Sequence, residues 1–184
     1  MNGWFLPASA EFSGREYAIN SDFRDVLEII SVLRDTEKHE RIRVIVALSL
    51  FYDDFDTMPT SEHQAAAEWM LKFISLGEED DGKSQPQLID WDQDRAIIAA
   101  EVNKVAGTEV RALDHLHWWT FISYFRSIGE GQLSYIVGIR DKLQKGKALE
   151  KHEREFYNKN RSMINIRKKL SSEEQNTLNK WIGK

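Results

Sequence analysis

The chain of 184 residues contains no cysteine. This absence excludes disulfide bonds, thiol catalysis and cysteine-based zinc sites. Long apolar runs are lacking as well. The longest aliphatic run, Val44 to Leu48, is far shorter than the roughly 18 residues that suggest a membrane-spanning helix. We therefore predict a protein without membrane association.

Glycine is scarce, at 10 residues, and the sequence holds no glycine-rich phosphate loop, no G-x-S-x-G motif and no H-E-x-x-H motif. A chain of this length buries roughly 70% of the surface that its unfolded form exposes, so folding requires neither a metal nor a cofactor. We expect a protein that is not an enzyme, with no catalytic, cofactor-binding or metal-binding residues.

The N-terminal sequence resembles a secretory signal in one respect, since Ala8-Ser9-Ala10 has the A-x-A form of a cleavage site. The apolar stretch before it is only three residues long, and no basic residue precedes it. A signal peptide needs both features. The pattern therefore favours a cytoplasmic protein.

Apolar residues recur at the three-and-four spacing of amphipathic helices over most of the chain after residue 20. We predict an all-α fold, a single compact multi-helix domain over residues 1–184 with about seven to eight helices. It comprises a short extended N-terminal arm (1–19), a helical core (20–170) and a C-terminal helical extension (171–184). Capping residues and glycines predict the helix ends. The helices start near Asn20, Thr36, Ser61, Asp92 or Asp90, Asp114, Gly131, Leu149 and Ser172, and Gly77, Gly107 and Gly129 end three of them.

Two segments also fit extended structure. Residues 11–19 fit either an extended arm or a hairpin before the helices. Apolar residues alternate with period two from Ile42 to Leu50, which fits a strand. We favour a helix there, because a single strand would lack a partner.

The last third of the chain is more polar. A long helix predicted from Leu149 presents Leu149, Phe156 and Met163 at seven-residue spacing. A short final helix is predicted from Ser172, which forms a capping-box pattern with Gln175.

Two patterns suggest metal ligands. Asp90, Asp92, Asp94 and Glu101 occupy the carboxylate positions of a calcium-binding loop. Arg95 stands where that loop needs glycine, so we favour an acidic first helical turn instead. His115 and His117 point about 200° apart on a helix, so one ion cannot readily reach both.

The adjacent residues Trp118 and Trp119 cannot both face one direction on a helix. We predict that one packs inward while the other meets a neighbouring element or a partner. Both are therefore candidate partner-binding residues.

The charge is unevenly distributed. Residues 1–94 carry a formal charge of −12 and residues 95–184 a charge of +7, within a total of −5. This asymmetry suggests a charged partner or a head-to-tail homo-oligomer, although solvated helix faces also produce it. The basic C-terminal stretch includes the candidate partner-binding residues Arg167, Lys168 and Lys169. Glutamates interrupt the stretch, and the net charge is acidic, so nucleic-acid binding is the less favoured alternative.

Specific segments of the sequence resemble the bacteriophage gene-product-fifteen family. Gly14-Arg15-Glu16-Tyr17-Ala18-Ile19-Asn20-Ser21-Asp22-Phe23-Arg24 is similar to its N-terminal signature, and Leu116-His117-Trp118-Trp119-Thr120-Phe121, with Phe125, to its central H-W-W-x-F segment. The I-x-x-I-R pattern that follows in the family is matched by Ile136 and Ile139-Arg140. The acidic opening of the family's preceding helix resembles Asp92-Gln-Asp94, and the charged stretch near the family's end resembles Lys151 to Ile166.

The resemblance implies a protein of tailed phages or prophages, encoded near the tail tube and tape-measure proteins. We expect a tail assembly chaperone that binds the tape-measure protein in the host cytoplasm and is absent from the mature virion. Other tail proteins are further candidate partners. The family supplies no catalytic or ligand-binding residues, and Ser171 to Lys184 extend beyond the resemblance. A structural virion component of the neck or tail is the alternative.

Overall fold

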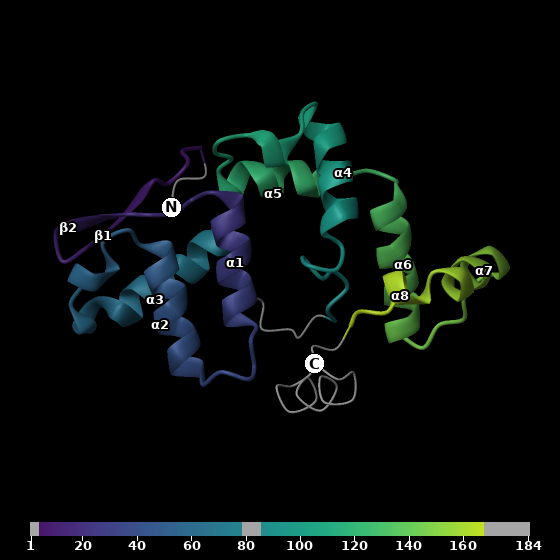
Figure 1. The fold of residues 1–184 in the computed structure, drawn as a ribbon, viewed down its shortest axis with the longest axis horizontal. Helices are drawn as coiled ribbons and strands as arrows, with labels where there is room; N and C mark the ends of the chain where they lie inside the picture. The colour runs from purple at the N-terminus through teal and green to yellow at the C-terminus, as the bar shows by residue number, and fades with distance from the viewer. Residues whose placement is uncertain (1–3, 79–85, 168–184) are drawn as a thin grey trace, which may run out of the picture. The chain divides into compact units, whose positions relative to one another are not determined.

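The computed structural model of the chain describes residues 4–78 and 86–167 (Figure 1). They belong to two compact units. We call Met1–Lys83 with Val110–Arg126 unit 1, and Ser84–Glu109 with Ser127–Lys184 unit 2. The division into two compact units does not test the prediction of a single domain over residues 1–184, which stays a prediction.

The fold is mostly helical, with eight α-helices in the described residues. The prediction of an all-α fold is corrected in one respect, because the N-terminal arm forms a small two-stranded antiparallel sheet. Of the two forms expected for that arm, an extended segment or a hairpin, the structure has the hairpin. In the part of the chain that the structure describes, no helix is long and apolar enough to span a membrane.

The hairpin pairs β1 (Ser9–Phe12) with β2 (Arg15–Ala18), in a register that places Phe12 opposite Arg15. Its two-residue turn has positive φ at both positions, 51° at Ser13 and 79° at Gly14. This is the backbone of a type I′ turn, which matches the twist of the strands that it joins.

Unit 1 contains helices from both of the chain stretches that form it. They are α1 (Phe23–Leu33), α2 (Glu40–Phe51), α3 (His63–Ile74) and α5 (Trp118–Arg126), with short 3-10 helices at Phe55–Thr57, Thr60–Glu62 and Val110–Ala112. Helix α2 confirms the helix favoured over residues 42–50. Helix α1 packs against both α2 and α5, and α2 packs against α3.

The core of unit 1 is rich in aromatic side chains. Phe23 stacks on Phe121 with ring centroids 4.5 Å apart, and Phe51 lies 5.3 Å from Phe73. The buried Tyr52 donates its hydroxyl hydrogen to the Ala66 carbonyl at 3.0 Å. These contacts join α1 to α5 and α2 to α3, which fixes the helices that position the first candidate site.

The described residues of unit 2 form four helices. They are α4 (Arg95–Ala106), α6 (Gln132–Gln144), α7 (Lys151–Lys159) and α8 (Arg161–Ile164). Helix α6 contacts both α4 and α8. The side chains of Val102, Ile136 and Ile164 are almost fully buried.

Several predicted helix starts are wrong by a few residues. Helix α3 begins at His63, because a 3-10 turn at Thr60–Glu62 takes the place of the capping box expected at Ser61. Helix α4 begins after Asp94, and α5 begins at Trp118, four residues after the expected cap Asp114. Gly107, at φ 69°, is confirmed as the end of α4.

The long helix predicted from Leu149 is also wrong, because it is broken at Asn160 into α7 and α8. Leu149 precedes α7, so the seven-residue apolar spacing does not follow one helix. The final helix predicted from Ser172 lies outside the described residues, as do Lys168 and Lys169.

Candidate functional site

Both tryptophans of the predicted partner surface lie inside unit 1. Trp118 is 2% exposed and Trp119 is 6% exposed, so of the two alternatives expected for the second tryptophan, a neighbouring element or a partner, the structure has the neighbouring element. Their indole nitrogens donate to neighbouring carbonyls, Trp118 Nε1 to Ile74 at 3.0 Å and Trp119 Nε1 to Phe73 at 2.9 Å. The last carbonyls of a helix lack partners within it. The tryptophan pair therefore caps the end of α3.

His117 precedes the tryptophans and connects α5 to the N-terminal arm. Its Nδ1 lies 3.1 Å from the Trp119 backbone N–H, and its Nε2 lies 3.0 Å from the Pro7 carbonyl. Because Nδ1 accepts while Nε2 donates, we assign the neutral tautomer with hydrogen on Nε2. Burial lowers the pKa of His117, outweighing the Pro7 bond that raises it, and the charge of nearby His115 lowers it further.

Asp22 joins α1 to the segment that leads into α5. Its carboxylate caps α1 through the Arg24 N–H at 2.9 Å and accepts the Leu116 N–H at 2.8 Å. Arg24 binds the same carboxylate through Nε at 2.7 Å and donates to the carbonyls of Leu113 and Asp114. Desolvation raises the pKa of Asp22, but these hydrogen bonds outweigh it, so the pKa lies below its ordinary value.

The segments that resemble the family's N-terminal and central signatures are therefore side by side in unit 1. Backbone bonds join them directly, from the Phe23 N–H to the Leu116 carbonyl at 2.9 Å and from the Trp118 N–H to the Ser21 carbonyl at 2.7 Å. The residues that make these two segments recognisable hold one part of the fold together.

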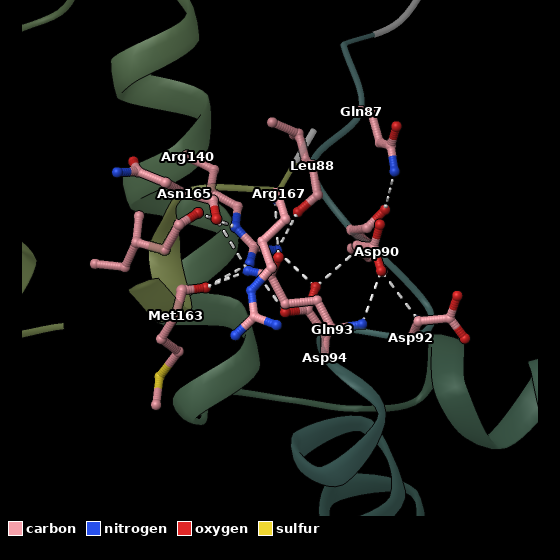
Figure 2. Close-up of polar contacts among 12 residues, drawn as sticks. Gln87, Leu88, Asp90, Asp92, Gln93, Asp94, Arg140, Met163, Asn165 and Arg167 are labelled. Carbon is pink, nitrogen blue, oxygen red and sulfur yellow. Dashed lines mark hydrogen bonds and ion pairs between the residues drawn. The ribbon is translucent and has the colours of Figure 1, made fainter. Parts of the chain in front are cut away.

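Unit 2 contains a second polar cluster, centred on Arg140 (Figure 2). The guanidinium forms two bonds to the Asp94 carboxylate, at 2.6 and 2.9 Å, and both side chains are nearly fully buried. It also donates to the carbonyls of Leu88, Met163 and Ile164, at 2.7 to 2.9 Å. A buried arginine requires such partners, because desolvation of an unpaired charge is costly.

Gln93 extends this cluster along the chain after α8. Its amide nitrogen lies 3.0 Å from the Met163 carbonyl and 3.1 Å from the Asn165 carbonyl, and its amide oxygen accepts the Arg167 N–H at 3.0 Å. Figure 2 shows Gln93, Asp94 and Arg140 converging on this segment. The side chains of Gln93 and Arg140 thus bind the backbone of this segment rather than the segment's side chains.

Three of the four carboxylates of the calcium-loop pattern, those of Asp90, Asp94 and Glu101, are bound to the protein's own donors. Asp90 accepts the backbone N–H groups of Asp92 and Gln93, and Asp94 binds Arg140. Glu101 accepts the Gln132 N–H and pairs with Lys104. In residues 4–78 and 86–167, no group of three or more histidine or acidic side chains is placed to hold a metal ion.

The basic C-terminal stretch is partly paired within unit 2. Lys142 lies 2.6 Å from Glu153, and this contact raises the pKa of Lys142 and lowers that of Glu153. Arg167 is exposed. It is the described member of the predicted basic site, and Lys168 and Lys169 lie outside the described residues.

The pairing of Asp94 with Arg140 was not predicted from the sequence. A signal was present, because Arg140 follows Ile136 by four residues and Ile139 by one, which places it beside the apolar face of the same helix. A charge in that position needs a buried partner. The spacing does not tell which of the carboxylates that precede α4 supplies it.

The geometry defines a mostly helical protein whose buried polar clusters bind its own backbone. A family model described as Bacteriophage Gp15 protein matches residues 5–166. The chain belongs to this family of bacteriophage proteins. Comparison with curated proteins and with solved structures gave no match.

Proposed function

We propose that this chain is a non-catalytic phage tail assembly chaperone. It binds the tape-measure protein in the host cytoplasm before tube subunits polymerise around that protein, and it is absent from the mature virion. The observation that carries the proposal is the family match over residues 5–166, which includes both polar clusters. The tape-measure protein is expected to be a long helical client that aggregates when its apolar face is uncovered.

The proposal requires an apolar surface that a client helix can cover. In unit 1, the side chains of Phe5 and Leu6 are 71% and 54% exposed, and they are adjacent in the chain. Ile42 on α2 and Leu71 on α3 are 54% and 52% exposed. Neighbouring exposed apolar residues mark interaction sites more often than scattered ones do. The pair Phe5 and Leu6 is therefore the candidate client contact in place of the buried tryptophans.

The test is co-expression with the tape-measure protein of the same phage, with an affinity tag on this chain. We expect the tape-measure protein to co-purify and its soluble fraction to rise. A tape-measure protein that stays insoluble and does not co-purify contradicts the chaperone role.

The surface is tested by the double variant Phe5→Ser/Leu6→Ser. We expect it to lose most of the co-purifying client while its circular dichroism spectrum and melting temperature stay those of the parent chain. Leu143→Ser is the matched control, because Leu143 on α6 is also partly exposed, at 37%, but belongs to unit 2. Equal loss in both variants contradicts a contact at Phe5 and Leu6.

Mass spectrometry of purified phage particles separates the chaperone from a structural component of the neck or tail. A chaperone is present in infected cells and missing from particles, whereas a structural component is present in both. Stoichiometric amounts in particles overturn the proposal in favour of the structural role.

A further inference from the structure

The segment after α7 is held by side chains that bind its backbone. Arg140 binds the carbonyls of Met163 and Ile164, and Gln93 binds the Asn165 carbonyl and the Arg167 N–H. Ile164 is 1% exposed and supplies the apolar anchor. We call Gln93, Asp94 and Arg140 the clamp and residues 161–167 the tail segment. The clamp thus binds the backbone of the tail segment at the end of α8 and just beyond it.

Helix α7 is attached to α6 by contacts that do not involve the tail segment. Lys142 on α6 lies 2.6 Å from Glu153 on α7, and Tyr135 packs edge-on against Phe156 with ring centroids 5.0 Å apart. The tail segment can therefore leave the clamp while α7 stays on α6. The change of direction occurs between them, at Asn160.

Asn160 has φ −126° and ψ 31°, outside the helical values of its neighbours. Its backbone N–H and its side-chain amide both donate to the Phe156 carbonyl, so one residue ends α7. A rotation of this residue to helical values joins α7 and α8 into one helix over residues 151–164. The seven-residue spacing of Phe156 and Met163 is typical of such a continuous helix.

We propose that Asn160 is the hinge of a segment exchange, in which the tail segment of each of two copies occupies the clamp of the other. In the exchanged dimer, helices α7 and α8 are continuous, and Arg140 of one copy binds the carbonyls of Met163 and Ile164 from its partner. The product is a closed dimer with two-fold symmetry.

The occupant is a second copy because the clamp already matches this segment. Exchange reproduces every clamp contact in an identical chemical setting, so it changes only the conformation of the hinge and the contacts between α7 and the tail segment, such as that of the Tyr157 hydroxyl with Asn165 at 3.3 Å. A foreign peptide would have to supply the same backbone path and an aliphatic anchor for the place of Ile164. A short hinge favours exchange when the two helices that it separates can also form one continuous helix. The inference concerns unit 2 alone and does not depend on the client proposed above.

The chain contains no cysteine, so single introduced thiols can report the exchange. The side chain of Gln132 lies 3.8 Å from the Met163 sulfur, and the two belong to α6 and to the tail segment. We suggest co-expression of Gln132→Cys with a differently tagged Met163→Cys, followed by treatment with a short bismaleimide. The exchanged dimer gives a covalent product that contains one copy of each variant.

Lys145→Cys, paired with Met163→Cys, is the matched control. Lys145 is exposed at the opposite end of α6 from Gln132, about 20 Å along the helix, so exchange does not place it near Met163. The double variant Gln132→Cys/Met163→Cys shows whether both thiols react within one chain. Cross-linking within single chains, with no mixed product at any protein concentration, overturns the proposal.

The hinge is tested by Asn160→Ala and Asn160→Gly. Both variants remove the side-chain bond to Phe156, so they differ mainly in their preference for helix. Alanine favours the continuous helix, and we expect its dimer association constant to exceed that of the glycine variant about fivefold per hinge, or about 25-fold for two hinges. Light scattering after size exclusion measures both constants. Equal constants, or monomers throughout, overturn the role of Asn160.

Discussion

Arg140 and Asp94 form a two-pronged ion pair inside unit 2, with N–O distances of 2.6 and 2.9 Å and side chains that are 3% and 1% exposed. The pair joins α6 to the start of α4. Because the same guanidinium binds three backbone carbonyls, the arginine also satisfies groups from two separate segments, at Leu88 and at Met163 and Ile164. Its role in the fold is therefore larger than that of an ion pair alone.

We expect Arg140→Ala to lower the free energy of unfolding by about 3–5 kcal/mol, because the substitution leaves the Asp94 charge buried without a partner. Urea unfolding followed by circular dichroism measures the change. The double variant Arg140→Ala/Asp94→Ala removes the unpaired charge and should recover part of the loss. It should not recover all of it, since the three carbonyls remain without their donor. A loss below about 1 kcal/mol in the single variant contradicts this account.

The tryptophan pair should behave as part of the core. We expect Trp118→Phe and Trp119→Phe each to lower the free energy of unfolding by at least about 1 kcal/mol, because each removes a buried indole N–H that binds a carbonyl at the end of α3. The loss should be smaller for Trp119, since the Phe73 carbonyl also accepts the Leu76 N–H at 3.0 Å. Once folded, both variants should co-purify with the tape-measure protein as the parent chain does. Loss of the client at unchanged stability would return the pair to the partner surface.

The sequence predicted the helices better than their ends. Periodicity located α1 to α6, and Gly107 marked the end of α4 as expected. The start of α5 was missed because the Trp119 N–H, in the first turn of the helix, binds His117. His117 is held in turn by the Pro7 carbonyl of the N-terminal arm, which is far from α5 in the sequence. Capping patterns report only local partners.

In two places the structure depends on contacts that local sequence patterns do not contain. Both tryptophans are buried because the carbonyls that accept their N–H groups belong to residues 44 and 46 positions away. The helix after Leu149 ends at Asn160, whose side chain binds the Phe156 carbonyl, and Arg140 and Gln93 bind the backbone beyond that residue. In both places a long-range polar contact supplements the local pattern.

Gly131 should be sensitive to a small side chain. A Cβ atom there would lie 2.8 Å from a carboxylate oxygen of Glu101, which is tied to the Gln132 N–H and to Lys104. We expect Gly131→Ala to cost about 1 kcal/mol of unfolding free energy through loss of the bond to Gln132.

Two other glycines serve as controls for Gly131. Gly129 and Gly138 have open space around a Cβ atom. Gly138→Ala, inside α6, should stabilise the protein by about 0.5–1 kcal/mol, and Gly129→Ala should have little effect. Similar losses at Gly131 and Gly129 in chemical unfolding would contradict a specific role for Glu101.

His117 should make stability depend on pH. Burial lowers its pKa in the folded state from the ordinary value near 6.5. The unfolded chain therefore takes up the proton at a higher pH than the folded chain. The stability that the neutral ring contributes is fully present above about pH 6.5 and is lost as the pH falls from there through the folded-state pKa.

His117→Asn keeps an acceptor that can reach the Trp119 N–H and cannot titrate in this range. We expect the parent chain to lose stability relative to this variant as the pH falls from about 7 to about 5. His115→Asn is the control, since His115 contacts Ser21 at the surface of the same segment. An NMR titration that places the pKa of His117 at or above its ordinary value would contradict the prediction.

The basic residues at 167–169 remain a predicted partner site, and charge reversal tests it. Arg167 is exposed, and its backbone N–H, which Gln93 binds, is retained in a glutamate variant. We expect Arg167→Glu/Lys168→Glu/Lys169→Glu to weaken co-purification with the tape-measure protein, most strongly at about 0.05 M salt, where screening is weakest. Lys151→Glu/Lys159→Glu/Arg161→Glu applies the same charge change to exposed positions of α7 and α8. Equal loss in the two triple variants would show an effect of net charge, and unchanged binding would remove residues 167–169 from the client surface.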